Sequence, residues 1–154
     1  MSSNVAAHTV LLRPLILGST SRYRRELLAR LHLPFEVEAP HVDETPEAGE
    51  QPEALARRLA LAKARAVAAR HPQAVVIGSD QVADLEGEPL GKPGTHARAV
   101  EQLQRMRGRT VVFQTALSVV CQASGFEMSD LAAVRVRFRS LSDPRDIPHE
   151  PVLM

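Results

Sequence analysis

The alternation of apolar and polar residues along the first half of the chain predicts both strands and helices. Apolar runs at 14–18 and 73–80 predict buried strands, and the alternating segment 35–39 predicts a strand with one face in water. Apolar side chains recur four residues apart in 22–32 and in 52–70, which is the spacing of one helix face. The chain therefore begins with strands and helices in alternation.

The second half of the chain adds a hairpin and two long strands to this pattern. Because helix crossovers and hairpins both occur, we expect an α/β fold with a mixed β-sheet flanked by helices. The predicted elements are a hairpin over 82–91 that turns at Glu86-Gly87, a helix over 94–106 that ends near Gly108, and strands over 109–120 and 132–141 joined by a turn at Ser124-Gly125.

Composition bounds the class of protein without naming a function. The 154 residues suffice for one domain with a core, and 44% hydrophobic and 24% charged residues are typical of a soluble domain. A formal net charge of +1 gives no reason to expect nucleic acid or a membrane as a partner. The single cysteine, Cys121, fits a reducing compartment, and no leader or membrane span is visible, so we expect a cytoplasmic protein.

A cluster of hydroxyl and basic side chains follows the first predicted strand, where a helix begins. Ser19, Ser21 and Arg24 lie at this strand-to-helix turn, where backbone N–H groups and the helix dipole attract anions such as phosphate. The alternative is an ordinary serine N-cap followed by solvated arginines. The glycines of a Walker loop are missing, so the turn is not of that kind.

Two carboxylates are candidates for metal binding or proton transfer. Asp80 follows the apolar run 74–78, and α/β sheets place ligand-binding groups at such strand ends; the alternative is an aspartate that starts a turn. Glu44 lies in the acidic, proline-rich segment 40–52, where a carboxylate either binds a metal ion or is simply solvated.

Several basic residues have two interpretations each. Lys63 lies on the apolar stripe of its predicted helix and either extends to solvent or reaches a phosphate across a cleft. Lys92, between Gly91 and Pro93, is either a surface turn residue or a phosphate ligand. Arginines alternate with apolar residues in the last predicted strand, which favours one solvated strand face over a nucleic-acid surface; they are Arg135, Arg137 and Arg139.

The order of these motifs along the chain is more specific than any one of them. From about residue 14 to about residue 143 the sequence closely resembles the Maf family of nucleoside triphosphate pyrophosphatases. The matching stretches are "LGSTSRYRRELL" (17–28), "VDET" (42–45), "LAKA" (61–64), "IGSDQV" (77–82) and "GKP" (91–93).

The resemblance implies a nucleotide cleft between two lobes, as in Maf and ITPase-like folds. It implies hydrolysis of a nucleoside triphosphate to the monophosphate and pyrophosphate, with a divalent cation such as Mg²⁺ or Mn²⁺. By position, Asp80 matches the proton acceptor, and Glu44 and Asp80 match acidic positions suited to the metal. The phosphate-binding positions match Ser19, Ser21, Arg24, Lys63 and Lys92.

Two positions resemble the branch of the family that acts on 7-methyl-GTP. Tyr23 stands where the branch acting on dTTP and UTP usually has arginine, and Gln81 stands where that branch has threonine. An aromatic ring suits a purine made cationic by N7-methylation, and an amide can bind a base edge. We therefore predict 7-methyl-GTP as substrate, with dTTP or UTP as the alternative.

The chain also departs from the family pattern. Arg22 replaces a proline, residues 1–13 form an extension, and residues 144–154 form a tail without family resemblance. The family sequence normally continues beyond 143, so we expect a shortened domain with exposed sheet edges unless another chain covers them. A weakly active or inactive nucleotide-binding protein therefore stays open as an alternative, and so does a homodimer.

Overall fold

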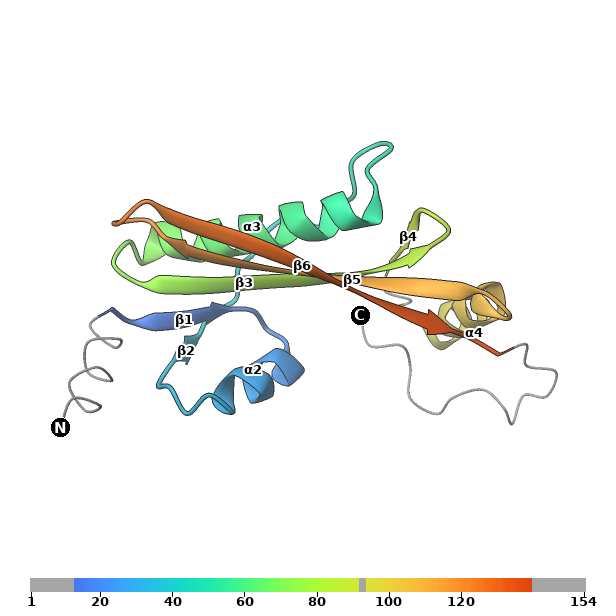
Figure 1. Cartoon of the computed structure of the whole chain (residues 1–154), viewed down its shortest axis with the longest axis horizontal. Coiled ribbons are helices and arrows are strands. Elements are labelled where there is room, and N and C mark those ends of the chain that lie inside the picture. Colours follow the sequence, from blue (N-terminus) through green and yellow to red (C-terminus); the bar gives the residue numbers. More distant parts are fainter. Residues whose placement is uncertain (1–12, 92–93, 140–154) are drawn as a thin grey trace.

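A six-stranded mixed sheet organises the computed structural model, which describes residues 13–91 and 94–139 (Figure 1). The strand order is β2-β1-β3-β5-β6, and β4 pairs with β3 off this path. The expected mixed α/β fold is thus confirmed. The elements are β1 (Leu15–Gly18), α2 (Arg22–Ala29), β2 (Glu36–Val37), α3 (Pro52–Arg70), β3 (Val75–Leu85), β4 (Glu88–Leu90), α4 (His96–Met106), β5 (Thr110–Cys121) and β6 (Phe126–Arg137).

Strand β3 joins the parallel and the antiparallel parts of the sheet. β1 pairs in parallel with β2 and with the start of β3. β3 then pairs antiparallel with β4 and β5, and β5 pairs antiparallel with β6. The predicted hairpin is present, and its turn residues Glu86 and Gly87 both have positive φ, 54° and 88°. Positive φ at both central residues matches the twist of a two-residue hairpin.

Helix α3 covers one face of the sheet (Figure 1). Pro52 at its first turn lacks the N–H that a helix start leaves unpaired, and Arg70 in its last turn complements the helix dipole. Its small residues let it approach the sheet closely: a Cβ on Gly78 of β3 would overlap the backbone oxygen of Ala60 and lie 2.6 Å from the backbone nitrogen of Ala64. Two of the three clusters of buried apolar residues lie along this contact.

Helices α2 and α4 lie on the other side of the strands from α3 (Figure 1). Met106 of α4 is buried with Ala83, Leu85 and Val111 in the third apolar cluster. Helix α2 buries none of its own residues, and Tyr23 and Leu27 on it are exposed. The face of the sheet near α2 is therefore covered only in part by the described residues.

Some predicted boundaries were wrong. Helix α2 ends at Ala29 instead of residue 32, and β2 has two residues instead of five. β3 continues to Leu85, so Asp80 lies within a strand and does not follow one. The reason is tertiary: β5 pairs with β3 as far as Leu85, well past the end of β1.

The last strand also differs from its prediction. β6 begins at Phe126, six residues before the expected start, because β5 pairs with it from the turn onward. The arginine side is solvated as expected, but the apolar side is not buried: Val134 is 56% exposed and Val136 is 36% exposed. Alternation indicated which side chains share a face, and it did not indicate whether anything covers that face.

Within 13–91 and 94–139, no helix combines the length and the apolar character needed to cross a membrane. Residue 13 is the one described member of the expected N-terminal extension, and the expected tail 144–154 lies outside the described residues.

Candidate functional site

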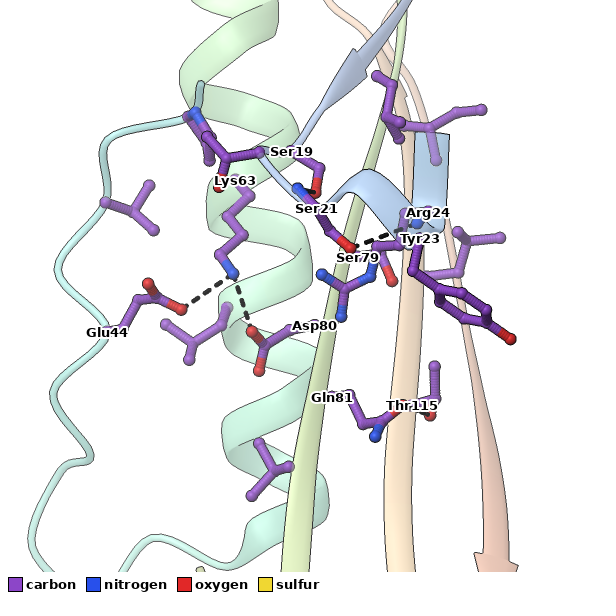
Figure 2. A pocket seen from close by; sticks show the side chains of 18 of the residues that line it. Ser19, Ser21, Tyr23, Arg24, Glu44, Lys63, Ser79, Asp80, Gln81 and Thr115 are labelled. Carbon is purple, nitrogen blue, oxygen red and sulfur yellow. Dashed lines mark hydrogen bonds and ion pairs between the residues drawn. The ribbon is translucent and has the colours of Figure 1, made fainter. Parts of the chain in front are cut away.

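A cleft of about 1300 Å³ lies beside the end of β1. Its walls come from the β1–α2 turn, the segment around Glu44, helix α3 and the middle of β3, β5 and β6. Charged and hydroxyl side chains such as Lys63, Asp80 and Ser21 line one part of it, and the ring of Tyr23 lies in another part (Figure 2). Apolar residues, among them Leu27 and Leu117, also belong to the lining. The cleft is large enough for a ligand with a charged and an apolar portion.

Lys63 lies between two carboxylates at the polar part of the cleft (Figure 2). Its Nζ is 2.9 Å from Oδ1 of Asp80 and 3.0 Å from Oε1 of Glu44. The side chains of Lys63 and Asp80 are 10% and 9% exposed, whereas that of Glu44 is about half exposed. Lys63 therefore does not extend to solvent, which was one of its two interpretations.

Asp80 lies on β3 just beyond the point where β1 stops pairing with that strand. Gly18, the last residue of β1, pairs with Gly78, and the chain then leaves the sheet toward α2. Asp80 lies two residues beyond this pair on β3, on the face that α3 covers, because side chains two apart in a strand share a face. It starts no turn, so that alternative is wrong.

Burial raises the pKa of Asp80 above its ordinary value of 3.8. The hydrogen bond and positive charge of Lys63 act in the opposite direction, and so does the charge of Arg24. The negative charge of Glu44 adds to the effect of burial. Asp80 is thus a carboxylate whose basicity is increased by desolvation while two cations favour its ionised form.

The serine turn before α2 has the geometry of a helix N-cap. Ser21 is the capping residue, and its Oγ accepts a hydrogen bond from the backbone N–H of Arg24 at 3.3 Å. Ser19 Oγ accepts from the N–H of Ser21 at 3.0 Å. The serine N-cap of that alternative is therefore confirmed, but Arg24 is only partly exposed and lines the cleft. Because each hydroxyl accepts through a lone pair, its own proton is left to donate to an anion, so capping and anion binding are compatible.

Arg24 brings a second cation to the same place. Its guanidinium points toward the part of the cleft that holds Asp80 (Figure 2). Burial lowers the pKa of Arg24 from its ordinary value of 12.5, and the nearby charges of Asp80 and Glu44 raise it. Arginine stays protonated in this range, so two cations and two carboxylates meet at one end of the cleft.

The segment that carries Glu44 is held against α3 by an arginine. Arg58 Nε donates to Glu50 Oε2 at 2.7 Å, and Arg58 Nη2 donates to Glu50 Oε1 at 2.9 Å and to the carbonyl of Thr45 at 3.1 Å. Asp43 Oδ1 also accepts from the N–H of Thr45 at 3.0 Å. These contacts link the acidic segment to the helix that carries Lys63.

Another set of cleft residues lies away from the carboxylates. Tyr23 is 60% exposed, and its ring extends away from Lys63 (Figure 2). Thr115 Oγ1 donates to Oε1 of Gln81 at 3.3 Å, across the β3–β5 pair. Leu117 and Asp130 also line the cleft. Sequence patterns did not indicate Thr115, Leu117 or Asp130, because the register of β5 and β6 that aligns these residues with β3 is not encoded in any local motif.

The structure brings most of the predicted site residues to one cleft. All of those that are described line it: Ser19, Ser21, Tyr23, Arg24, Glu44, Lys63, Asp80 and Gln81. They come from four separate stretches of the chain. Lys92 lies outside the described residues, so its predicted role stays a prediction.

The fold and the sequence both match known proteins. The structure is similar to a HAM1 protein from Coxiella burnetii, with a TM-score of 0.56 and 16% identity over 80% of this chain and 72% of that chain, which supports the fold alone. The family model for Maf-like proteins matches residues 14–146. The chain belongs to the Maf-like family.

Individual relatives carry a more specific name. The chain is 72% identical over 142 residues to a protein of Polaromonas sp. (strain JS666) named 7-methyl-GTP pyrophosphatase, and 69% identical over 131 residues to a protein of the same name from Albidiferax ferrireducens. The matches cover 92% and 85% of this chain. They cover 65% and 66% of those relatives, so the chain spans about two thirds of their length.

Proposed function

We propose that this chain contributes to hydrolysis of a nucleoside triphosphate, 7-methyl-GTP, to the nucleoside monophosphate and pyrophosphate. One observation carries the proposal: two cations, two carboxylates and two serine hydroxyls from separate parts of the chain meet at one end of a cleft whose other part is apolar. The cations and hydroxyls can bind a triphosphate, and the apolar part can bind a nucleobase. The names of the relatives agree with this assignment.

The phosphates bind at the start of α2. Ser19 and Ser21 donate their hydroxyl protons to phosphate oxygens, and the N-terminus of α2 contributes its dipole. Arg24 adds a charge-assisted hydrogen bond. Lys63 exchanges part of its interaction with Glu44, which is half exposed, for a phosphate oxygen. Lys92 remains a proposed phosphate ligand from its position in the sequence motif.

Asp80 acts as the general base. It takes a proton from a water molecule whose oxygen attacks the α-phosphorus; the bond from that phosphorus to the bridging oxygen breaks, and pyrophosphate leaves. Burial favours this role because it raises the pKa of Asp80 and makes the carboxylate a stronger base. Lys63 holds the carboxylate in place at 2.9 Å.

Glu44 and Asp80 fit a divalent cation that is shared with the substrate. Their carboxylates approach the same ammonium from two sides, so their oxygens already converge. Across the described part of the chain, no three His, Cys, Asp or Glu side chains gather that would hold an ion by themselves. Mg²⁺ commonly takes one or two carboxylates together with substrate phosphates. When bound there, such an ion would neutralise phosphate charge and would make a water molecule easier to deprotonate.

The nucleobase of the substrate is recognised in the part of the cleft that lies away from the carboxylates. Tyr23 offers an exposed ring at the cleft, and a purine made cationic by N7-methylation stacks favourably on such a ring. Gln81, held by Thr115, binds a polar edge of the base. These roles are proposed on the contacts of the two side chains and on their positions in the motifs.

Pyrophosphate release from 7-methyl-GTP, GTP, UTP and dTTP in the presence of Mg²⁺ or Mn²⁺ tests the proposal. We expect pyrophosphate and 7-methyl-GMP in equal amounts, and a decrease of at least about a hundredfold in kcat for Asp80→Asn. Asp84→Asn, on the same strand and outside the cleft lining, is the matched control.

Three results would contradict the assignment. Release of inorganic phosphate would show cleavage at another bond. Preference for UTP or dTTP would favour the other branch of the family. Tight binding of 7-methyl-GTP without turnover would leave a nucleotide-binding protein in place of an enzyme.

A further inference from the structure

Strand β6 is a long edge of the sheet that residues 13–91 and 94–139 form. Within the described residues it pairs with β5 alone, over twelve consecutive residue pairs from Phe126 to Arg137 without a bulge. Natural proteins protect such edges with charges, prolines or bulges, because an unpaired strand is a template for another strand. β2, at the other end of the sheet order, has only two residues.

In every second residue of β6, the backbone N–H and C=O groups point away from β5. The N–H of Phe138 donates to the carbonyl of Arg109 at 3.0 Å, which extends the β5–β6 ladder. Hydrogen-bonded and non-hydrogen-bonded pairs alternate in an antiparallel ladder. The N–H and C=O groups of the even-numbered residues of β6 therefore point toward β5. The N–H and C=O groups of the odd-numbered residues, from Glu127 to Arg137, therefore point away from the sheet.

The side chains of β6 are arranged symmetrically about its middle. Four exposed apolar residues lie in two groups, Phe126 and Met128 near the start and Val134 and Val136 near the end. Opposite charges also lie near the two ends of the strand, with Glu127 near its start and Arg135 near its end. Leu131 is the residue midway between these groups.

We infer that β6 pairs antiparallel with β6 of a second copy of this chain, about a two-fold axis at Leu131. In this register Phe126 lies opposite the partner's Val136, and Met128 lies opposite the partner's Val134. Glu127 lies opposite the partner's Arg135. Each contact occurs twice by symmetry, so the apolar residues pair with one another and the charges are complementary.

The hydrogen-bonding pattern permits this register. An axis at Leu131 pairs odd-numbered residues with odd-numbered residues, and these are the ones whose backbone groups point to the free edge. Moving the axis to Ala132 sets Asp130 against the partner's Val134. Moving it to Asp130 sets Glu127 against the partner's Ala133, so the carboxylate loses its cation.

Glu127 already has a cation within its own chain. Arg65 of α3 donates to both of its carboxylate oxygens, at 2.8 and 2.7 Å. A carboxylate has about four acceptor positions, so it accepts a second guanidinium from the partner's Arg135. The result is an ion-pair network of Arg65, Glu127 and the partner's Arg135 on each side of the axis.

The axis lies next to the cleft. Asp130, Leu131 and Ala132 of β6 line it, and in the dimer the partner's Ala132 lies opposite Asp130. The dimer therefore extends the wall of each cleft. This inference stands on the edge strand and not on the proposed function, so either can fail alone.

Charge reversal tests the interface. In Arg135→Glu the charges opposite one another are both negative, and in Glu127→Arg they are both positive. By sedimentation equilibrium we expect a dimer of the unmodified chain, at least a tenfold increase in the dimer Kd for each variant, and recovery in an equimolar mixture of the two. Val37→Lys, at the exposed edge strand β2, is the control for a general effect of surface charge.

Several outcomes would overturn the inference. An unmodified chain that is monomeric would mean that another segment or another protein covers β6. Variants that dimerise like the unmodified chain, or a mixture that stays monomeric, would exclude this register. Circular dichroism and urea unfolding of each variant separate lost association from lost folding.

A cysteine placed on the axis tests the register directly. Opposing residues of a hydrogen-bonded antiparallel pair have Cα atoms about 5.5 Å apart, within the range of a disulfide. Leu131→Cys is therefore expected to form a disulfide-linked dimer, and Ser129→Cys is not. The unmodified chain, whose Cys121 is buried, is the background control. Cross-linking through position 129 instead of 131 would overturn the register.

Discussion

Lys63 of α3 binds Asp80 of β3 at 2.9 Å, and both side chains are almost completely buried. The pair joins the helix to the strand at the place where β1 ends and the cleft begins. A buried pair of this kind costs desolvation, and it is destabilising to remove one partner only. Its location beside Glu44, Arg24 and the serine turn makes it the centre of the proposed active site.

Removing the cation of this pair should affect both activity and stability. In Lys63→Met the carboxylates of Asp80 and Glu44 lose their shared partner, so we expect kcat/KM for 7-methyl-GTP to fall at least about a hundredfold. The free energy of unfolding should fall by about 3 kcal/mol, measured by urea denaturation. Arg57→Met, at an exposed position on the same helix, should change neither quantity appreciably. Equal effects of the two variants would contradict the role of the pair.

The close contact between α3 and β3 predicts a large effect of one methyl group. Gly78→Ala places a Cβ against backbone atoms of Ala60 and Ala64, which cannot move without shifting the helix. We expect a loss of about 3 kcal/mol in the free energy of unfolding, with lower activity because Lys63 lies on the same part of α3. Gly91→Ala is the control, since no described atom beyond its chain neighbours lies within 4 Å of the added Cβ. Comparable stability of the two variants would show that the helix adapts.

The ring of Tyr23 predicts a change in substrate preference. Tyr23→Arg removes the stacking surface and adds a charge that repels a cationic base, so the ratio of kcat/KM for 7-methyl-GTP to that for UTP should fall roughly tenfold. Tyr23→Phe keeps the ring and should keep the ratio. Steady-state kinetics with both nucleotides measures it, and an unchanged ratio in the arginine variant would refute the assignment.

The contact between Glu50 and Arg58 predicts a pH-dependent contribution to stability. Hydrogen bonds from Arg58, and then from the N–H of Glu47, lower the pKa of Glu50 from 4.5 to about 2. A group with a lowered pKa stabilises the fold fully above the unfolded value of 4.5, and this contribution is lost as the pH falls toward 2. The difference in Tm between the unmodified chain and Glu50→Gln should therefore be constant above pH 5.5 and shrink between pH 4.5 and pH 3.

A control for this pH series is Glu53→Gln, an exposed glutamate on the first turn of α3. Its difference in Tm from the unmodified chain should be small throughout. A difference for Glu50→Gln that stays constant from pH 7 to pH 3 would mean that Arg58 does not depend on this carboxylate to hold the segment carrying Glu44.

Local sequence patterns determined the types and most of the positions of the elements. The periodicity from Pro52 to Arg70 predicted α3 with its bounds, and Glu86-Gly87 predicted the hairpin turn, because both depend on contacts between residues near in sequence. The ordered motifs indicated the family and which residues to examine. These signals are local, and each can be recognised from residue types and spacing alone.

Only the tertiary structure decided how those residues meet. The length of β3, and so the place of Asp80 within it, depends on pairing with β5, and the ion pairs of Lys63 depend on how closely α3 packs on Gly78. The same holds for the apolar side of β6: its alternation is visible in the sequence, whereas its exposure among the described residues is not. The physical reason is that burial and distance are set by segments far apart in the chain, and residue spacing carries no record of which segments pack together.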